Sequence, residues 1–213
     1  MITLSSIFFS SFLIAFSGAV MPGPLLTVTI SESTKRGFKV GPLVILGHGI
    51  LELALVVSII FGLAPFLNKT SVFIVIAIAG SAILMWMALG MLKSIPKLTL
   101  TFNVDDEQKK NKLVFSGLFL SLINPYWIIW WVSIGLGYIL HSLKVGTLGV
   151  IFFFVGHILA DLVWYTFISF SVSKGSSFLN DKMYKILIAV CAIFLVFFSI
   201  MFGYSGVRKF IAM

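Results

Sequence analysis

Six stretches of the chain are each long and apolar enough to cross a lipid bilayer. They cover residues 4–30, 40–64, 72–92, 113–140, 146–172 and 184–207. A helix needs about 20 predominantly apolar residues to span the hydrocarbon core. Lipid offers no partner to backbone polar groups, so a spanning segment must be a helix or part of a closed barrel. The stretches are far longer than the strands of an outer-membrane barrel. We therefore predict an all-α membrane protein with six transmembrane helices.

The composition agrees with a membrane protein in contact with lipid. Of the 213 residues, 60% are hydrophobic and 10% are charged, whereas a soluble domain carries about 25% charged residues. The net charge of +8 does not indicate a nucleic-acid partner, because the basic residues lie between the apolar stretches, as membrane topology requires. No motif of an enzyme or of a phosphate-binding loop is present. We expect neither enzymatic activity nor a cofactor.

The basic residues also predict an orientation. Eleven of the 15 Lys and Arg follow the first, third and fifth stretches, and four lie on the other side. Cytoplasmic loops carry the excess of Lys and Arg, so both termini are expected outside the cytoplasm. The polar segment 93–112 is then a cytoplasmic linker. It separates a first repeat, residues 1–92, from a second repeat, residues 113–213, with three spans in each.

An odd number of spans places the second half upside down relative to the first. Each half has a proline-interrupted span, followed by a span that contains a Gly-His pair and then an acid. Such inverted repeats, with broken helices near a central site, are typical of secondary transporters. We predict two inverted three-helix repeats with broken helices 1 and 4. Chance similarity between apolar spans is the alternative.

The first span is interrupted by Met21-Pro22-Gly23-Pro24. Two prolines remove two backbone donors and clash with the preceding turn, while proline is well placed in a first helical turn. We expect the helix to unwind and to restart at Pro24. Leu25 and its neighbours would then present free N–H groups to an anionic group such as a carboxylate. The alternative is a kink that only shapes packing.

The fourth span contains Asn124-Pro125-Tyr126 at the corresponding place in the second half. Proline predicts a second break, and the Asn124 amide can bond a freed carbonyl group or a ligand. Three tryptophans follow, at 127, 130 and 131. We interpret them as an interfacial belt or as packing rather than as gates of a pore.

The interiors of the spans contain only four residues of the types His, Asp, Glu, Lys and Arg: His48, Glu52, His157 and Asp161. A charge at the bilayer centre costs about 2.5–3.5 kcal/mol even on the mild insertion scale. The spacing of four in each pair places histidine and acid on one helix face. Such groups suit proton relays, and two imidazoles with two carboxylates also suit a divalent metal. A structural clasp between helices is the third interpretation.

Together these motifs resemble the lysine exporter (LysE/RhtB) family of amino-acid efflux proteins, over essentially the whole chain. The resemblance is carried by Met21-Pro22-Gly23-Pro24, by Glu52 five residues after Gly47, and by Asn124-Pro125. It implies export of basic or small neutral amino acids from prokaryotic cells, driven by the proton gradient. It also implies that Gly23, Pro24, Asn124 and Pro125 line the substrate site, and that Glu52 is the functional acid.

The sequence departs from the family pattern at three places. The family usually has Gly-Asp where this chain has Leu51-Glu52, preceded by His48. Tyr126 stands where many members have lysine, and the second His-acid pair is not typical. The wider superfamily that it resembles includes exporters of divalent metals. These departures concern the identity of the substrate and not the fold.

We expect a multi-pass transporter of the cytoplasmic membrane that exports amino acids by proton antiport. The predicted substrate-binding residues are Gly23, Pro24, Leu25, Asn124, Pro125 and Tyr126. The predicted proton-coupling residues are Glu52, Asp161, His48 and His157. The same four residues would be the ligands of a divalent metal in the alternative, a metal cation exporter. A non-transporting membrane subunit is the third hypothesis, and self-association is left open.

Overall fold

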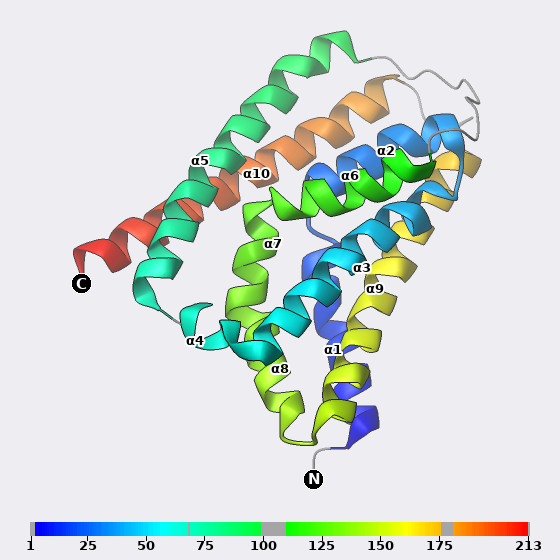
Figure 1. Ribbon diagram of the computed structural model, residues 1–213. Coiled ribbons are helices and arrows are strands. Elements are labelled where there is room, and N and C mark those ends of the chain that lie inside the picture. Colours follow the sequence, from blue (N-terminus) through cyan, green and yellow to red (C-terminus); the bar gives the residue numbers. More distant parts are fainter. Residues whose placement is uncertain (1–2, 68, 99–109, 176–180, 213) are drawn as a thin grey trace.

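The computed structural model describes residues 3–67, 69–98, 110–175 and 181–212, and every regular element in these ranges is helical (Figure 1). The first part holds α1 (Leu4–Ala19), α2 (Pro24–Arg36), α3 (Val40–Ser58), the π-helical turn η1 (Ile59–Leu63), α4 (Ala64–Leu67), α5 (Thr70–Ser94) and the short turn η2 (Ile95–Lys97). The second part holds α6 (Lys110–Leu122), α7 (Pro125–Trp130), the π-helical turn η4 (Trp131–Gly135), α8 (Leu136–Leu143), α9 (Thr147–Lys174) and α10 (Asp181–Ile211). The prediction of an all-α protein is confirmed.

Five continuous helical runs are long and apolar enough to cross a membrane. They are Val40–Phe66, Thr70–Lys97, Pro125–Leu143, Thr147–Lys174 and Asp181–Ile211. The pair α1 and α2 makes a sixth span if it is counted as one segment bent by 80°. The prediction of six spans is thus consistent with the described helices, with the first span broken.

The fourth predicted span, 113–140, is two separate helices. Helix α6 ends at Leu122, and a new helix begins at Pro125 and continues through α8. Proline has no backbone N–H, and it pushes the preceding residue out of helical geometry. Asn124 accordingly has an extended conformation, with φ −83° and ψ 105°. With 13 residues, α6 is about 20 Å long and too short to span a bilayer alone.

A central bundle and a lateral helix pair form the molecule. In the bundle, α1 packs along α9, α6 packs along α3, and α3 also contacts α9. The long helices α5 and α10 lie side by side at one side of the bundle, and α5 joins it through α7 (Figure 1). The charged pairs are on α3 and α9, so this arrangement places them in the bundle core.

Helices α3 and α6 approach each other closely because glycine lies at their crossing. A β-carbon on Gly47 would overlap the carbonyl oxygen of Val114, and one on Gly117 would overlap the carbonyl oxygen of Val44. Small residues of this kind let helix backbones come together within membranes. The close contact matters for the site because His48 and Ser121 lie on these same two helices.

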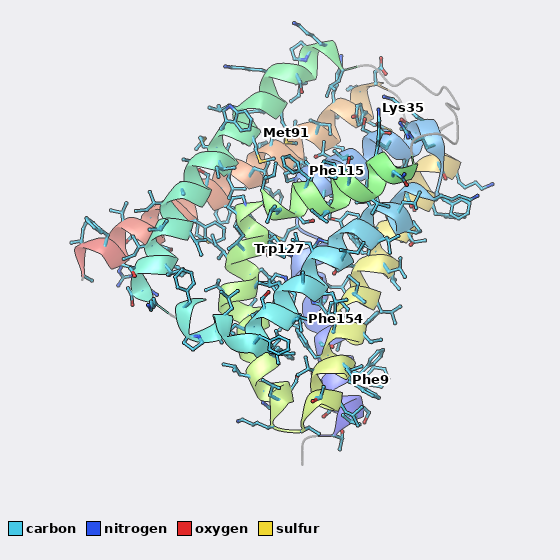
Figure 2. The ribbon with its side chains drawn as sticks, viewed as in Figure 1. Phe9, Lys35, Met91, Phe115, Trp127 and Phe154 are labelled. Carbon is cyan, nitrogen blue, oxygen red and sulfur yellow. The ribbon has the colours of Figure 1, made fainter. Side chains whose placement is uncertain are left out.

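The outer surface is apolar. Phe9 on α1 and Phe115 on α6 are 63% and 65% exposed and point away from the bundle (Figure 2). Exposed aliphatic and aromatic side chains also cover α5 and α10. Large apolar surfaces of this extent are stable when lipid covers them, so the distribution agrees with a protein embedded in a bilayer.

The basic ends of the helices lie together. The C-terminal ends of α2, α5 and α9 lie toward the upper right of Figure 1, and the two chain termini lie toward the opposite side. Lys185 at the start of α10 donates a hydrogen bond to the carbonyl oxygen of Pro96 in η2, at 3.3 Å. Of the predicted linker 93–112, residues 99–109 lie outside the described part of the chain. The division at this linker stays a prediction.

Candidate functional site

The first helix breaks where the Pro-Gly-Pro sequence predicts. Helix α1 ends at Ala19, Gly23 is extended with φ −158°, and α2 begins at Pro24. The backbone N–H groups of Leu25 and Leu26 have no hydrogen-bond partner within the described residues, since the first bond of the new helix is from Thr27 N to Gly23 O at 3.0 Å. Helix α2 thus starts with free donors and the positive end of its dipole.

The second break lies opposite the first. The Oδ1 atom of Asn124 accepts a hydrogen bond from the backbone N–H of Tyr126, at 3.1 Å, and so caps α7. The Nδ2 atom of Asn124 would lie 3.9 Å from a β-carbon on Gly23. The amide group of one break therefore faces the backbone of the other.

Side chains of the second break also hold the end of α1. The Tyr126 hydroxyl donates to the carbonyl oxygen of Ser17, at 3.0 Å, and Trp130 Nε1 donates to Ser17 Oγ, at 3.1 Å. The last carbonyl groups of a helix have no partner within the helix. Tyr126 supplies one for Ser17, whose usual donor, Met21 N, bonds to Gly18 O instead.

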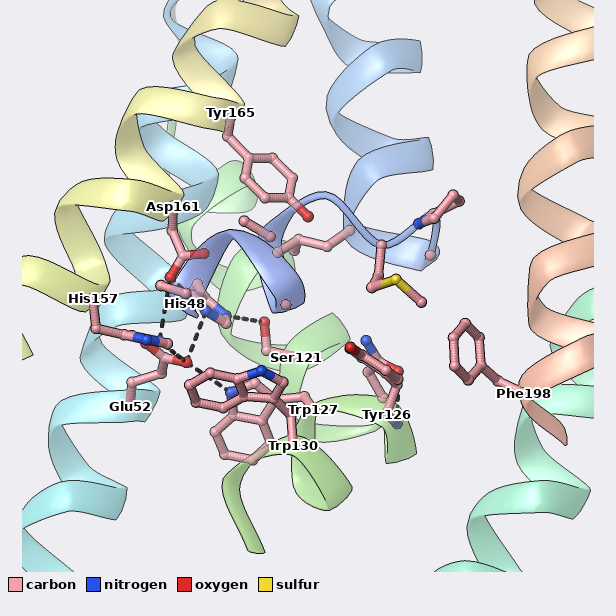
Figure 3. Close-up of a pocket in the computed structure, with 18 of the residues that line it drawn as sticks. His48, Glu52, Ser121, Tyr126, Trp127, Trp130, His157, Asp161, Tyr165 and Phe198 are labelled. Carbon is pink, nitrogen blue, oxygen red and sulfur yellow. Dashed lines mark hydrogen bonds and ion pairs between the residues drawn. The ribbon is translucent and has the colours of Figure 1, made fainter. Parts of the chain in front are cut away.

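Both His-acid pairs meet in the core, as Figure 3 shows. His48 Nε2 lies 3.0 Å from Glu52 Oε1, and His157 Nε2 lies 3.5 Å from Asp161 Oδ2, so each pair shares one helix face as predicted. The pairs are also joined to each other: His157 Nε2 lies 3.0 Å from Glu52 Oε2, and His48 Nε2 lies 3.7 Å from Asp161 Oδ2. All four side chains are buried. The grouping combines opposite charges whenever the imidazoles are protonated.

Glu52 is the most heavily hydrogen-bonded of the four residues. Its Oε1 atom accepts from Trp127 Nε1 at 3.0 Å and from Trp131 Nε1 at 2.9 Å, in addition to the two histidines. The side chain is 1% exposed. A carboxylate can stay buried when charged partners and N–H donors surround it, and here the donors come from α3, α7, η4 and α9.

His48 has a partner that suits either of its protonation states. Its Nδ1 atom lies 2.7 Å from Ser121 Oγ, and the same hydroxyl can donate to the carbonyl oxygen of Gly117 at 2.7 Å. With Nε2 protonated toward the carboxylates, a neutral ring accepts from Ser121. A charged ring donates to Ser121, whose hydrogen then turns to Gly117. The ring can gain or lose a proton without losing this contact.

His157 lies among aromatic rings. The ring centroids of Trp130, Trp131 and Phe153 are 4.9, 5.3 and 5.9 Å from that of the imidazole. Its Nδ1 atom is buried and has no hydrogen-bond partner within the described residues. Aromatic faces attract a cation, so this surrounding tolerates a protonated ring.

A cavity of about 60 Å³ joins the charged cluster to the two breaks. About 10–15 Å³ of such space is enough for one water, so the cavity has room for several water-sized groups. Its walls include the four clustered residues, and from the predicted substrate site Gly23, Leu25, Asn124 and Tyr126.

The two remaining predicted residues lie elsewhere. Pro24 is buried and contributes to a separate shallow groove with Trp86 and Met87. Pro125 is buried against Gly80 of α5, where a β-carbon would lie 2.5 Å from Pro125 Cβ. Both prolines start helices whose neighbouring residues reach the cavity.

A family profile described as LysE type translocator matches residues 16–206. The chain belongs to this family. It is therefore a multi-pass membrane transporter and not an enzyme. The translocator is also similar to a protein of Bacillus subtilis (strain 168), named "Putative amino acid efflux protein YcgF". The two are 22% identical over 205 residues, which cover 96% of this chain and 98% of the relative. No solved structure matches this translocator.

Among the residues of the candidate site that sequence reasoning missed are Trp127 and Trp131, which bind Glu52. An interfacial belt is wrong for them, since Trp131 is 1% exposed and both indoles donate to Glu52. The other part of the interpretation, that these tryptophans pack within the protein, agrees with the structure. Their spacing of four residues, directly after the second break, places both on one helix face, and that signal could have indicated a shared target.

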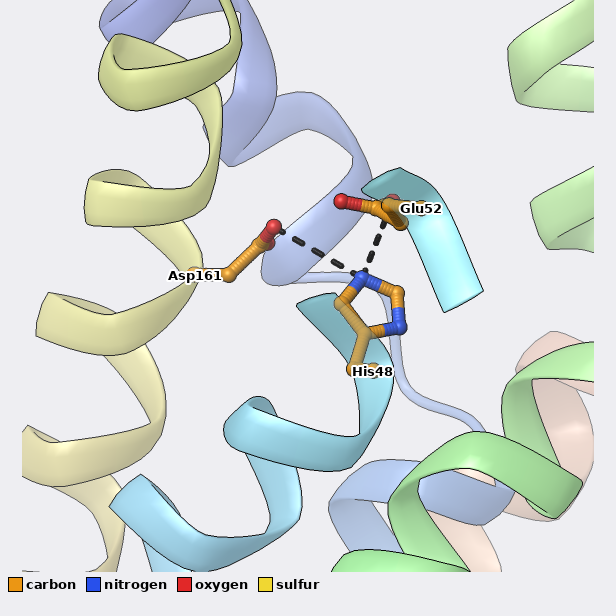
Figure 4. A group of neighbouring side chains, drawn as sticks. All are labelled: His48, Glu52 and Asp161. Carbon is orange, nitrogen blue, oxygen red and sulfur yellow. Dashed lines mark ion pairs between the residues drawn. The ribbon is translucent and has the colours of Figure 1, made fainter. Parts of the chain in front are cut away.

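Three of the clustered side chains could also bind a cation together. One possible ligand atom from each of His48, Glu52 and Asp161 lies within 4.8 Å of the other two. Figure 4 shows how the three side chains converge. Imidazole nitrogen and carboxylate oxygen are the ligands of zinc and similar divalent ions. The hydrogen bonds of Glu52 Oε1 to both indoles reduce what that atom offers to a metal, so its second oxygen would be the ligand.

Proposed function

We propose that this translocator exports amino acids across the cytoplasmic membrane in exchange for protons. The observation that carries the proposal is the cavity in which two helix breaks meet a buried cluster of two imidazoles and two carboxylates. The breaks supply unpaired backbone and amide donors for a carboxylate, and the cluster supplies groups that titrate. The name of the B. subtilis relative supports the substrate class.

The substrate would bind at the breaks. Gly23 and Leu25 bring the free N–H groups of α2 to the cavity wall, and Asn124 and Tyr126 face them from the second break. Broken helices whose N-termini point at an anionic group are a recurring device of secondary transporters. Pro24 and Pro125 would act by starting the two helices rather than by touching the substrate.

Protons would be carried by Glu52 and Asp161 together with His48 and His157. The groups that face Glu52 are both histidines, Asp161 beyond them, and the indoles of α7 and η4. Protonation of Glu52 would weaken its attraction to both imidazoles and so loosen the contact between α3 and α9. One proton exchanged per substrate supports about a tenfold substrate gradient for each unit of pH difference, since about 1.4 kcal/mol is tenfold.

The two parts of the chain would be inverted repeats, with both termini outside the cytoplasm. Helix α1 packs along α9 as α6 packs along α3, and the mutual contacts of α3 with α9 and of α5 with α10 fit a two-fold relation. The excess of Lys and Arg at the ends of α2, α5 and α9 supports a cytoplasmic location for that side.

The test is efflux from proteoliposomes that contain the purified full chain. A panel of labelled amino acids and divalent metals would be loaded inside, and efflux would be measured with and without an inward proton gradient. We expect amino acids to leave faster when protons flow in, with alkalinisation of the outer medium. Absence of any amino-acid transport, in protein that is correctly folded, would exclude the proposal.

A divalent cation is the second candidate cargo, favoured by the donor atoms of His48, Glu52 and Asp161. In that case His48→Ala would abolish transport as fully as loss of either acid, and the metal alone would raise the thermal stability of the wild-type protein. If metals move and amino acids do not, the metal candidate replaces amino-acid export.

A further inference from the structure

The cavity is chemically different at its two ends, as Figure 3 shows. The cluster on α3 and α9 forms one side, and Tyr126 with Phe198 of α10 lies on the other. Leu195 of α10 and Met21 complete the apolar part of the wall. An extended ligand in this cavity would therefore have a charged end near α9 and an apolar end near α10.

Asp161 is the less engaged of the two buried carboxylates. It is 4% exposed, it lines the cavity, and its Oδ2 atom accepts no hydrogen bond within the described residues. The nearest imidazole nitrogens lie 3.5 and 3.7 Å away, beyond good hydrogen-bonding distance. Glu52 has closer partners: two indoles and both imidazoles lie at its Oε1 atom, and its Oε2 atom, which likewise accepts no hydrogen bond within the described residues, lies 3.0 Å from His157 Nε2. A buried acceptor of this kind can accept a hydrogen bond from an ammonium or another N–H group of a ligand.

The wall of the same cavity also contains N–H donors for a carboxylate. Leu25 and Gly23 at the start of α2 have unpaired N–H groups, and Asn124 Nδ2 forms no hydrogen bond within the described residues. A helix N-terminus with free N–H groups binds anions. Together with Asp161, this provides for both charges of a zwitterion.

The apolar end of the cavity offers no partner for a third charge. Among the described residues that line the cavity there is no Lys or Arg, and both carboxylates, Glu52 and Asp161, belong to the cluster at the other end. The side chain of a bound amino acid would face Leu195, Phe198 and Tyr126. An ammonium, guanidinium or carboxylate placed there would be desolvated without a partner, which strongly disfavours binding.

From these observations we infer that the substrate is an amino acid with one ammonium, one carboxylate and an uncharged apolar side chain. Asp161 binds the ammonium, and Leu195 and Phe198 receive the side chain. This assignment rests on the proposed export of amino acids and narrows it by excluding basic members of the class.

The first experiment is competition in proteoliposomes that contain the full chain. Alanine, valine and leucine compete for counterflow of a labelled neutral amino acid, whereas lysine and glutamate compete about tenfold less well or worse, as expected for an unpaired buried charge. Leucine amide and N-acetylleucine, each lacking one charge of the zwitterion, also fail. Lysine transport equal to that of leucine would overturn the inference while amino-acid export stands. Failure of every amino acid would instead overturn the proposed function.

The second experiment moves a charge to the apolar end. Phe198→Glu provides a partner for a second ammonium, so the lysine-to-leucine transport ratio rises by about tenfold or more. Phe198→Gln is the matched control of nearly the same shape, and it lowers leucine transport without admitting lysine. Unchanged selectivity in folded Phe198→Glu would place the side chain elsewhere and refute the inference.

A third variant decides the role of Asp161 if Phe198→Glu does not fold. Wild-type protein discriminates leucine from 4-methylpentanoate, which has the same carbon skeleton and no ammonium. Asp161→Asn loses most of this discrimination, because the amide cannot pair with the charge. A purely structural role would lower transport of both compounds and leave their ratio unchanged, and that result would refute the assignment.

Discussion

The close crossing of α3 and α6 can be tested with a single methyl group. In Gly47→Ala the new β-carbon overlaps the carbonyl oxygen of Val114 and lies 2.9 Å from the backbone nitrogen of Leu118. Both neighbours are backbone atoms, so neither can rotate away. The two helices must separate by on the order of 1 Å, and such overpacking costs about 1–3 kcal/mol.

The separation would also reach the charged cluster. The bond between His48 Nδ1 and Ser121 Oγ, 2.7 Å long, joins the same two helices. A shift on the order of 1 Å stretches it to about 3.7 Å, which is no longer a hydrogen bond. We therefore expect Gly47→Ala to lower both thermal stability and efflux, although alanine is intrinsically a better helix former than glycine by about 1 kcal/mol.

Gly90→Ala on α5 is the matched control, because nothing lies within 4 Å of its added β-carbon. It should unfold at or above the wild-type temperature and transport normally. Thermal unfolding in detergent and efflux from proteoliposomes measure both variants. Wild-type stability and transport in Gly47→Ala would show that the helices do not cross as closely as described.

Three further predictions address the mechanism and the topology. Glu52→Gln keeps the shape of the side chain but cannot ionise, so the pH dependence of efflux should flatten, and an unchanged pH profile in reconstituted protein would exclude Glu52 from proton coupling. Pro22→Ala combined with Pro24→Ala should favour a continuous first helix, in which the free backbone N–H groups of α2 are bonded within the helix, so transport should fall. Wild-type transport by the inserted double variant would show that these prolines serve only packing. For the topology, the single cysteine of the chain is first removed by Cys191→Ala. An impermeant thiol reagent added to whole cells should then label Lys144→Cys and not Lys97→Cys. The reverse labelling pattern would invert the proposed orientation.

Local chemistry predicted much of the site. Proline kinks or breaks a helix when it occurs in the interior, so the break of the first span and the new start at Pro24 followed from the chain itself. The spacing of four likewise predicted that His48 meets Glu52 and that His157 meets Asp161. These are interactions within one helix, where geometry is known before folding.

Contacts between different helices were harder to predict from the sequence. The inverted-repeat interpretation predicted that the two His-acid pairs face each other, but which atoms meet, such as Glu52 with His157, depends on how α3 packs against α9. The tryptophans were interpreted as an interfacial belt or as packing, because indoles are common at membrane interfaces. The separation of α6 from α7 was underestimated for a related reason, since apolar content alone does not distinguish a kinked span from two helices.

The two hydrogen bonds from the second break to Ser17 have a mechanical consequence. Tyr126 and Trp130 both bond to this one residue at the end of α1, so α1 cannot move away from α7 without rupturing two bonds. At about 0.5–1.5 kcal/mol each, they resist separation by about 1–3 kcal/mol in total, enough to synchronise the two segments and small enough for thermal motion to overcome. When either segment is displaced as a rigid body, the end of α1 and the start of α7 would therefore move together, whichever face of the membrane the cavity opens to.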